Sequence, residues 1–457
     1  MKIHVICILL TNIFVQLQSL SLSEIKVGYQ VTIAIPTVYT RGFQGRAFLI
    51  GADQKTEPFF RAAVSIEAGE NEKYSCSIDV FLGEVKVWSS GHLSRFYAVE
   101  KCVLELTENG DLRLKGEKEL IGWRSGTPGQ GVKRLLLLRT GNLVLVDESS
   151  LIKWQSFNFP TDVMLWGQRL SSRTWLTSFP MNSTLFYSLE IQHDKLVLYL
   201  NFGKSKYSYW EYRPNDERGV TFAMLSSNGL GLFNGSHKFV EIRSNDREPV
   251  RFMSLDNRTG NLIFYRYSEE NKKFEASYRA LDSTCDLPLA CGPYGFCYSS
   301  GSCSCIGGFD CKNENLEGLC GEKSTGVEML ELRGAVSVLR SASSGGNIGR
   351  DECAKSCLND CKCLAVGYDG NFGECFLYEV ARGIKQVEKR GEVVYMVKVP
   401  KGVVVHNGHD KNSGLKKWVI VVVGLVDGLI ILIVLGGIGC YVILKRRRNL
   451  PGRGQGT

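Results

Sequence analysis

The sequence predicts a mostly β, multidomain extracellular protein that one helix near its C-terminus anchors in a membrane. Three observations support this prediction. Short segments that read as strands alternate with glycine-containing turns over the first part of the chain. Cysteines then crowd between Cys285 and Cys375, as in small modules that disulfides hold together. Finally, residues 418–444 form an almost uninterrupted apolar run that is long enough to span a bilayer.

The first residues have the layout of a secretory signal peptide. Lys2 precedes a short apolar stretch, which fades into small and polar residues at 19–23. The stretch is too short to cross a bilayer as a helix. We therefore expect a cleaved signal peptide at 1–23, with an N-terminal anchor as the alternative.

The apolar run at 418–444 contains a single charge, Asp427. An acid at the helix centre costs about 3 kcal/mol on insertion scales, whereas each Leu, Ile or Val returns roughly 0.3–0.6 kcal/mol. The many aliphatic residues of the run outweigh that cost. The basic residues of the stub at 445–457 favour the cytosolic side, so we expect a single-pass type I protein of the plasma membrane with an extracellular N-terminus.

Asp427 lies in a small-xxx-small pattern between Gly424 and Gly428. Such a pattern lets two helices approach closely, and acids within membranes rarely face lipid. These three residues are therefore candidates for a membrane contact, either in a homodimer or with a partner receptor kinase. The alternatives are that glycine is simply common in membrane helices and that a protonated acid is tolerated in a strong anchor.

The formal net charge of +8 comes mostly from the C-terminal cations. No basic patch indicates a nucleic-acid partner. Cys7 leaves with the signal peptide and Cys440 lies in the apolar run, and the other cysteines are expected to form disulfides in an oxidising compartment. These are Cys76, Cys102, Cys285, Cys291, Cys297, Cys303, Cys305, Cys311, Cys320, Cys353, Cys357, Cys361, Cys363 and Cys375. Glycosylation is expected at the sequons of Asn182, Asn234 and Asn257.

A weak internal repeat runs through the first part of the chain. Three similar segments, 85–90, 120–125 and 151–156, each carry one tryptophan, and between them lie segments that read as hairpins. The tryptophans are Trp88, Trp123 and Trp154. One tryptophan for each repeat, buried on a shared axis, predicts a domain with pseudo-threefold symmetry.

The end of this repeat resembles a known family. One stretch is similar to the end of the bulb-type lectin domain of plant G-type lectin, or S-domain, receptor-like proteins. It consists of Trp154-Gln155-Ser156-Phe157-Asn158-Phe159-Pro160-Thr161-Asp162, followed by Gly167 and Leu170. The resemblance implies a lectin domain at 24–170 that folds as a β-prism of three antiparallel sheets. Residues 171–280 are similar to the S-locus glycoprotein domain, through Leu176-Thr177-Ser178-Phe179, Tyr209-Trp210 and the segment 255–262. We expect that domain to be rich in β-strands.

The cysteine-rich part extends the resemblance. The spacing from Cys285 to Cys305, with Gly308-Phe309 after it, resembles the family's EGF-like module, which we place at 281–322. The calcium-binding kind of EGF module needs acidic residues just before its first cysteine, where this chain has only Asp282, so we expect no bound calcium. A PAN/apple module is expected at 323–400 and a juxtamembrane linker at 401–417.

The cysteine spacing of the PAN segment predicts how the module is crosslinked. Cys353 and Cys357 would lie on one face of a helix that Asp351 and Glu352 begin, and Cys361 and Cys363 on one face of a strand. This spacing would let disulfides attach the helix to a sheet. A zinc site is the competing interpretation, but secreted thiols oxidise and no histidine interleaves with the cysteines. We expect no metal and no cofactor.

The family's mannose sites carry Gln, Asp, Asn, Val and Tyr at alternate positions of one strand. Aligned on Asn142, this chain offers Leu138, Thr140, Asn142, Val144 and Val146, so only Asn142 and Val144 match. They are the candidate carbohydrate-binding residues. Because the polar Gln and Asp are replaced, we favour the alternative that Asn142 and Val144 maintain the hairpin.

The sequence contains neither the motifs of a protein kinase nor any other catalytic constellation, so we expect no enzyme. The layout is closest to PAN domain-containing receptor-like proteins. It predicts a receptor-like or co-receptor protein that binds an extracellular carbohydrate or protein and has no kinase of its own. The alternatives are a truncated form or gene model of an S-domain receptor Ser/Thr kinase, and a membrane-anchored lectin without a signalling role.

Overall fold

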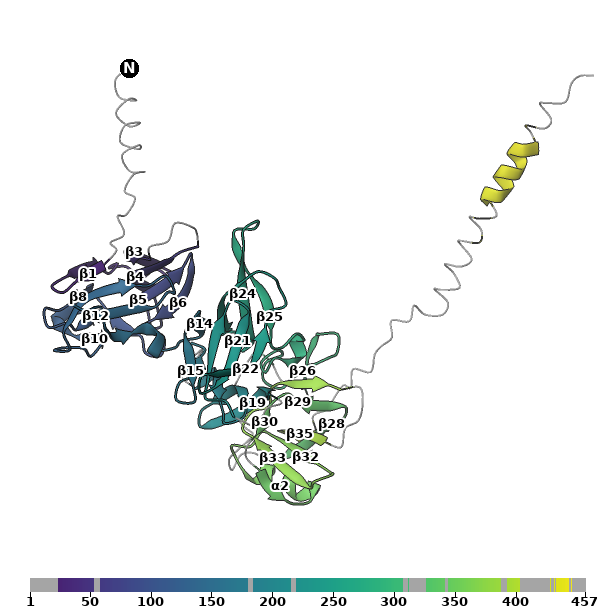
Figure 1. Cartoon of the computed structure of the whole chain (residues 1–457). Coiled ribbons are helices and arrows are strands. Elements are labelled where there is room, and N and C mark those ends of the chain that lie inside the picture. Colours follow the sequence, from purple (N-terminus) through teal and green to yellow (C-terminus); the bar gives the residue numbers. More distant parts are fainter. Residues whose placement is uncertain are drawn as a thin grey trace, which may run out of the picture. The chain divides into compact units, whose positions relative to one another are not determined.

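A computed structural model of the chain (Figure 1) describes residues 24–402, except 53–57, 180–183, 215–218, 307–310, 312–325, 342–343 and 388–392, together with 428, 431, 433–443 and 445. The described residues up to 402 belong to one compact unit, and those from 428 onwards belong to a second. Strands dominate the first unit, as the sequence predicts.

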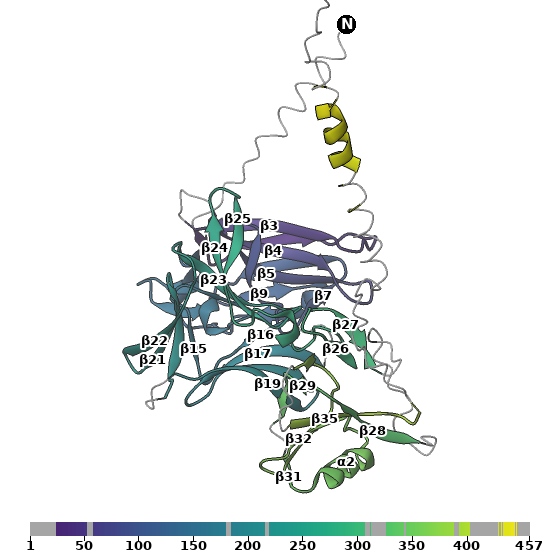
Figure 2. The ribbon, with the colours of Figure 1, turned by 90° about the vertical axis from the view of Figure 1, so that its right-hand side faces the viewer.

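The first domain is a β-prism made of three antiparallel sheets, with the orders β3-β4-β5-β6, β10-β9-β8-β2 and β1-β11-β12-β13, and β7 pairs with β5. Figure 2 shows β3, β4 and β5 side by side in the first of these sheets. The predicted hairpins are present as β8–β9 and β11–β12, and the three tryptophan segments form the edge strands β6, β10 and β13. The bounds are β1 Glu24–Lys26, β2 Gln30–Ala34, β3 Gln44–Gly51, β4 Phe60–Ala68, β5 Tyr74–Leu82, β6 Val85–Ser89, β7 Phe96–Ala98, β8 Lys101–Leu106, β9 Leu112–Lys115, β10 Ile121–Arg124, β11 Val132–Leu137, β12 Leu143–Asp147 and β13 Ile152–Gln155, with short 3₁₀ helices η1 Glu117–Glu119 and η2 Ser156–Asn158.

Glycine at two hairpin turns is required by geometry. Gly110 has φ +87° and Gly141 has φ +82°, values that side-chain-bearing residues rarely adopt. A Cβ on Gly110 would lie 2.8 Å from the Val132 Cβ, and one on Gly141 would lie 2.5 Å from the Phe60 ring. The glycine signals in the sequence therefore mark turns that pack tightly against neighbouring strands.

A second prism follows, which the sequence predicted only as a β-rich domain. Its sheets have the orders β16-β17-β18-β19, β15-β20-β21-β22 and β14-β23-β24-β25. It begins with β14, before the boundary expected at residue 170. The bounds are β14 Val163–Leu165, β15 Arg169–Ser171, β16 Leu176–Thr177, β17 Leu185–Ile191, β18 Leu196–Phe202, β19 Ser205–Tyr212, β20 Phe222–Ser226, β21 Gly229–Asn234, β22 His237–Arg243, β23 Val250–Leu255, β24 Leu262–Ser268 and β25 Lys273–Arg279.

The two prisms share one topology. In the first, β1, β2 and β3 each add to a different sheet, in the order third, second and first. In the second, β14, β15 and β16 do the same in the same order. In each prism, three strands therefore join the three sheets in turn, and the three sets of hairpin-connected strands follow them.

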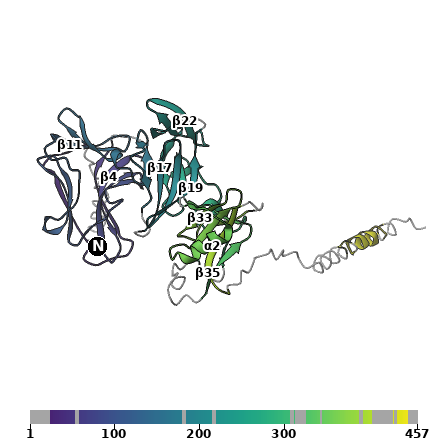
Figure 3. The same cartoon turned by 90° about the horizontal axis from the view of Figure 1, so that it is seen from below.

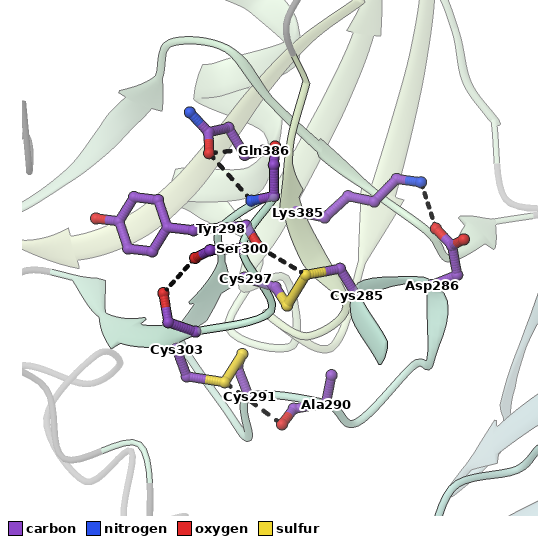
Figure 4. The surroundings of a disulfide bond; sticks show 12 residues. Cys285, Asp286, Ala290, Cys291, Cys297, Tyr298, Ser300, Cys303, Lys385 and Gln386 are labelled. Carbon is purple, nitrogen blue, oxygen red and sulfur yellow. Dashed lines mark hydrogen bonds and ion pairs between the residues drawn. A yellow bond between two sulfur atoms is a disulfide. The ribbon is translucent and has the colours of Figure 1, made fainter. Parts of the chain in front are cut away.

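The EGF-like segment consists of η3 (Thr284–Asp286) and the strands β26 (Gly295–Cys297) and β27 (Cys303–Cys305). Figure 4 shows two neighbouring disulfides here, Cys285–Cys297 and Cys291–Cys303, and a third joins Cys305 to Cys311. Lys385 Nζ contacts Asp286 Oδ1 at 2.5 Å (Figure 4), and β26 pairs in parallel with β34 of the PAN module. The segment is thus connected to the module that follows it.

The PAN module is a five-stranded sheet, β28-β35-β32-β33-β31, on which helix α2 packs (Figure 3). The helix begins as expected, with Asp351 and Glu352 in its first turn and the Gly349 N–H donating to the Glu352 carboxylate at 3.3 Å. The bounds are α2 Arg350–Asn359, β28 Val327–Leu332, β29 Ala335–Ser337, β30 Arg340–Ser341, β31 Ser344–Asn347, β32 Ala365–Asp369, β33 Glu374–Tyr378, β34 Ile384–Gln386 and β35 Val393–Pro400.

The disulfides of α2 join it to the module in two ways. Cys353 is bonded to Cys375 of β33, and Cys357 to Cys363. The expectation that Cys361 and Cys363 lie on a strand is wrong, because both precede β32. Asp360 forms a turn there, with its carboxylate accepting the Lys362 N–H at 2.9 Å and its carbonyl accepting the Cys363 N–H at 3.2 Å.

The other expected disulfide cysteines divide as follows. Cys76 of β5 is bonded to Cys102 of β8, so this bridge links two sheets of the first prism. Cys361 is also disulfide-bonded. Cys320 lies outside the described residues.

The second prism and the PAN module share a hydrophobic core. Strand β30 pairs with β19, the Tyr207 ring stacks on that of Tyr378 at a centroid distance of 5.8 Å, and the Tyr207 hydroxyl accepts the Glu379 N–H at 2.8 Å. Neither module therefore buries its apolar surface alone.

Residues 433–443 are helical, as are 428, 431 and 445. In the described part of the chain, no helix has both the length and the apolar character needed to cross a membrane. Most of the predicted juxtamembrane and membrane segments, Gly424 and Asp427 included, lies outside the described residues. Gly428 is helical, and apart from its chain neighbours and the backbone of its own helix no described atom lies within 4 Å of the position that a Cβ on it would take.

Candidate functional site

The three repeat tryptophans meet on the axis of the first prism, as the sequence predicts. Trp88 comes from β6, Trp123 from β10 and Trp154 from β13. Their ring centroids lie 5.7–6.4 Å apart, and every pair is arranged edge to face, at interplanar angles of 72–78°. Edge-to-face packing is favourable because the positive edge of one ring meets the negative face of the next.

A serine two residues after each tryptophan joins its segment to a neighbouring strand. The Ser90 Oγ accepts the Ile78 N–H at 2.9 Å. In the next two repeats, Ser125 Oγ accepts from Leu112 and Ser156 Oγ accepts from Leu143, each at 3.0 Å. The Trp-x-Ser echo in the sequence is therefore a structural unit, in which one residue fills the axis and the other satisfies a backbone donor.

An open pocket of about 470 Å³ lies against these tryptophans, and we call it the tryptophan pocket. Trp175 and Phe159 form exposed walls, with 51% and 54% of their surfaces accessible. Phe159 is held in place because its ring stacks on Trp154 at 5.8 Å and its carbonyl accepts the Trp88 Nε1–H at 2.9 Å. The lining residues are Trp88, Ser89, Ser90, His92, Leu93, Trp123, Arg124, Ser125, Trp154, Asn158, Phe159, Pro160, Thr161, Arg173, Thr174, Trp175 and Thr177.

The charged groups of the pocket are basic. Arg124 and Arg173 line it, and no lining residue is acidic. The Arg124 guanidinium lies 3.1 Å from Oδ2 of Asp111, whose carboxylate is buried. Within the described parts of the chain, Arg173 forms no ion pair, so its guanidinium is available to a ligand.

His92 is the other titratable residue of the pocket, and it is buried. Its Nε2 lies 2.7 Å from the Thr177 carbonyl oxygen, which can only accept, so Nε2 carries the proton. Burial lowers the pKa of His92, although the Asp162 carboxylate 3.8 Å from its Nδ1 opposes this. Burial in turn raises the pKa of Asp162. The pair links the first prism to the start of the second.

The two residues expected to bind carbohydrate do not lie in this pocket. Asn142 is 5% exposed and Val144 is 1% exposed. The Asn142 Nδ2–H donates to Gln155 Oε1 at 2.8 Å, and its Oδ1 accepts from the Ser156 hydroxyl and the Phe157 N–H, both at 3.2 Å. Asn142 thus maintains the hairpin and its neighbouring strand, which is the interpretation favoured from the sequence, and sugar contact by either residue stays a prediction.

Asp111 and Asn261 play the same part at the corresponding turns. Asp111 Oδ1 accepts from the Ser125 hydroxyl and from the Gly126 and Thr127 N–H groups at 3.0–3.2 Å. Asn261, in the second prism, exchanges hydrogen bonds with both backbone groups of Leu281, at 2.7 and 3.1 Å. A polar residue directly after the turn glycine therefore serves each time as an internal brace.

Two of the predicted glycosylation sites, Asn234 and Asn257, are described, and neither lines the tryptophan pocket. Asn257 is exposed in the turn between β23 and β24, and Asn234 ends β21 and donates from Nδ2 to the Gly219 carbonyl at 3.1 Å. Asn182 lies outside the described residues.

Among the described residues, one group of cysteines, Cys291, Cys297 and Cys303, has sulfur atoms close enough together to hold a metal ion. Their sulfur atoms belong to the two disulfides of Figure 4, so they offer no thiolate to a metal.

Sequence reasoning placed the tryptophans on the axis but did not recognise the pocket. The walls that the sequence did not predict are Phe159 and Trp175. Phe159 lies within the family motif at 154–162, and Trp175 follows the expected end of the lectin domain. A large aromatic residue, Trp175, directly after the polar stretch Ser172-Arg173-Thr174 was the available signal.

Comparisons with protein families match three parts of the chain. The D-mannose binding lectin model matches residues 87–179, which include every residue of the tryptophan pocket. The S-locus glycoprotein domain matches 234–313 and the PAN domain matches 331–398. The chain carries lectin, S-locus glycoprotein and PAN domains. The S-locus match extends through most of the segment expected to be a separate EGF-like module.

Its homologues include plant G-type lectin S-receptor-like kinases, a PAN domain-containing protein and EP1-like glycoproteins. A G-type lectin S-receptor-like serine/threonine-protein kinase of Arabidopsis thaliana is 26% identical over 65% of this chain and 38% of that protein. A PAN domain-containing protein of the same plant is 28% identical over 59% of this chain and 58% of that protein. EP1-like glycoprotein 3 is 28% identical over 66% of this chain and 76% of that protein. The chain thus spans less than two thirds of the first two relatives.

Among solved structures, a monomeric monocot mannose-binding lectin from Gastrodia elata matches 30% of this chain and 96% of its own, at 19% identity and a TM-score of 0.18.

Proposed function

We propose that this protein is the ligand-binding part of a receptor-like protein and that its lectin domain recognises an extracellular carbohydrate. The observation that carries the proposal is the match of the lectin model to the segment that builds the tryptophan pocket. The lectin, S-locus and PAN domains are non-catalytic binding modules, and no kinase domain is present in the sequence given. Binding is therefore the activity to test.

Carbohydrate binding can be tested with the full chain, purified from secretory cells into lipid nanodiscs and applied to a glycan array. The proposal expects saturable binding to a defined group of glycans, and competition by the same glycans in solution. A properly folded preparation that binds no glycan would contradict it and would favour a protein ligand instead.

We further propose type I insertion in the plasma membrane, which the signal-like segment at 1–23 and the apolar run at 418–444 support. Asn257→Gln should remove one glycan in secretory cells, and a tag after Thr457 should resist protease added to intact cells. A tag cleaved from outside would contradict this orientation.

Signalling through a partner receptor kinase is part of the same proposal. Gly424, Asp427 and Gly428 are the proposed contact. Co-purification of a kinase that is lost in Asp427→Leu and retained in a matched Leu435→Ile variant would support it. Kinase-free complexes with strong glycan binding would favour an anchored lectin, and a kinase reading frame beyond Thr457 in the transcript would show a truncated receptor kinase.

A further inference from the structure

We propose that the tryptophan pocket is a site for an acidic sugar, a pyranose that carries a carboxylate, as in an oligomer of uronic acids. This inference rests on the proposed carbohydrate binding and assigns it to a site and a chemical class. It differs from the alternate-position motif around Asn142, because that residue is buried and its polar atoms hold the hairpin.

The pocket has the size and walls of a ligand site. Its volume of about 470 Å³ falls within the range of roughly 300–1,000 Å³ that small-ligand pockets occupy. Trp175 and Phe159 leave about half of their surfaces in water, although large aromatic side chains gain most when they are covered. Trp154 and Trp88 hold Phe159 in position, so that wall is already formed before a ligand arrives.

The combination of flat aromatic walls with polar groups fits a sugar ring. A pyranose presents C–H bonds on its faces and hydroxyl groups around its edge. A ring that lies on Trp175 would cover its apolar face, while its hydroxyls would meet polar side chains of the lining, such as Asn158 and Thr174.

The charge of the pocket selects the acidic form. Arg173 is exposed and, as far as the chain is described, unpaired with any carboxylate, and Arg124 is a second basic residue of the lining. Asp111, the acid beside Arg124, is already engaged by that arginine and by backbone donors. A guanidinium binds a carboxylate through two parallel hydrogen bonds, which gives both orientation and affinity.

The test uses two ligands that differ only in charge. Binding of the full chain in nanodiscs is measured by calorimetry with a galacturonic acid oligomer and with its fully methyl-esterified form. We expect the acid to bind at least tenfold more tightly at low salt, and the difference to shrink at high salt. Decanoate, an aliphatic carboxylate, should not compete.

Variants then locate the site. Arg173→Gln should remove most of the preference for the acid while leaving affinity for the ester unchanged, and Trp175→Ala should weaken both ligands at least tenfold. Arg41→Gln and Trp166→Ala change an exposed arginine and an exposed tryptophan outside the pocket and should have no effect. Denaturant unfolding of each variant checks that the fold is retained, since all four residues are exposed.

Equal binding of acid and ester, binding of decanoate, or indifference to Arg173→Gln would overturn the inference. These outcomes differ from a failure of the proposed function. If other glycans bind but the pocket variants do not matter, only this inference fails, whereas absence of binding to any glycan contradicts both.

Discussion

Asp111 and Asn142 occupy the same place in successive repeats of the lectin domain. Each follows a turn glycine with positive φ, each is almost fully buried, and each accepts backbone N–H groups just beyond a Trp-x-Ser segment. The position that carries a sugar-binding asparagine in the family motif is here a brace between strands. That relationship leads to the first prediction.

Asn142→Ala should destabilise the protein by about 2 kcal/mol, because the part-buried Phe157 N–H and the buried Ser156 hydroxyl lose their acceptor. Urea unfolding of the full chain measures this. Thr140→Ala, at an exposed position of the same turn, should change stability by less than about 0.5 kcal/mol. Glycan affinity of folded Asn142→Ala should equal that of the wild type, and a selective loss of affinity would show that Asn142 does contact sugar.

Trp154→Ala should cost about 3–5 kcal/mol, since it empties the axis on which three indole rings pack and removes the support of Phe159. Trp175→Ala should cost less than about 1 kcal/mol, because that ring is already half exposed. Chemical denaturation distinguishes the two. A large stability loss in Trp175→Ala would mean that the wall is part of the core rather than a ligand surface.

Lys86 neutralises two acids of the first prism. Its Nζ lies 2.9 Å from Asp79 Oδ2 and 2.6 Å from Glu67 Oε1, and Asp79 is fully buried. Burial acts to lower the pKa of Lys86, but the two carboxylates outweigh it and raise that pKa.

Lys86→Met should therefore cost about 3–5 kcal/mol, because the Asp79 charge is left buried without a partner. The double variant with Asp79→Asn should recover most of that loss in thermal unfolding. Equal losses in the single and double variants would show that the side-chain packing of Lys86, and not its charge, is what matters.

Stability should fall at alkaline pH because buried tyrosines must ionise. Burial raises the pKa of Tyr209, whose hydroxyl donates to the Gly260 carbonyl at 2.5 Å, and burial likewise raises the pKa of Tyr187 and Tyr294. The unfolded chain loses these protons near pH 10 and the folded chain keeps them. Their contribution is complete below pH 10 and is lost as the pH rises towards the folded-state pKa values.

Each such tyrosine should lower the free energy of unfolding by up to about 1.4 kcal/mol for each pH unit above 10. Urea titrations between pH 8 and pH 11 measure the slope. Tyr209→Phe should make the fall of the free energy of unfolding with pH less steep, by the contribution of one tyrosine. At neutral pH the same variant should be about 1 kcal/mol less stable, because one hydrogen bond is lost. An unchanged slope would mean that Tyr209 ionises in the folded protein.

The two disulfides of α2 should contribute differently to the stability of the protein. Cys353–Cys375 closes a sequence separation of 22 residues and Cys357–Cys363 one of 6. In the chain-entropy model, replacing the first pair by alanines should cost about 3 kcal/mol and the second about 2 kcal/mol. Guanidinium unfolding of the two double variants compares them. A reversed order would indicate that anchoring the helix end near Asp360 matters more than loop closure.

Local sequence patterns were sufficient for much of the first prism and of the PAN module. The hairpins β8–β9 and β11–β12 were readable because glycine turns separate short apolar runs, and the tryptophan axis because one residue recurs in each repeat. Helix α2 was readable from its acidic first turn and the spacing of Cys353 and Cys357. All of these features depend either on contacts between residues close in the chain or on one residue type that recurs in each repeat.

Tertiary structure alone decided the second prism, the fate of Asn142 and the pocket. Strand β14 pairs with β23 far along the chain, and no local pattern encodes such a partner. Alternation along a strand separates two faces but does not say which is covered, so a sugar motif and a buried brace look alike at Asn142. Likewise, Phe159 and Trp175 become walls of one cavity only in the folded chain, because a cavity is formed by surfaces that folding brings together.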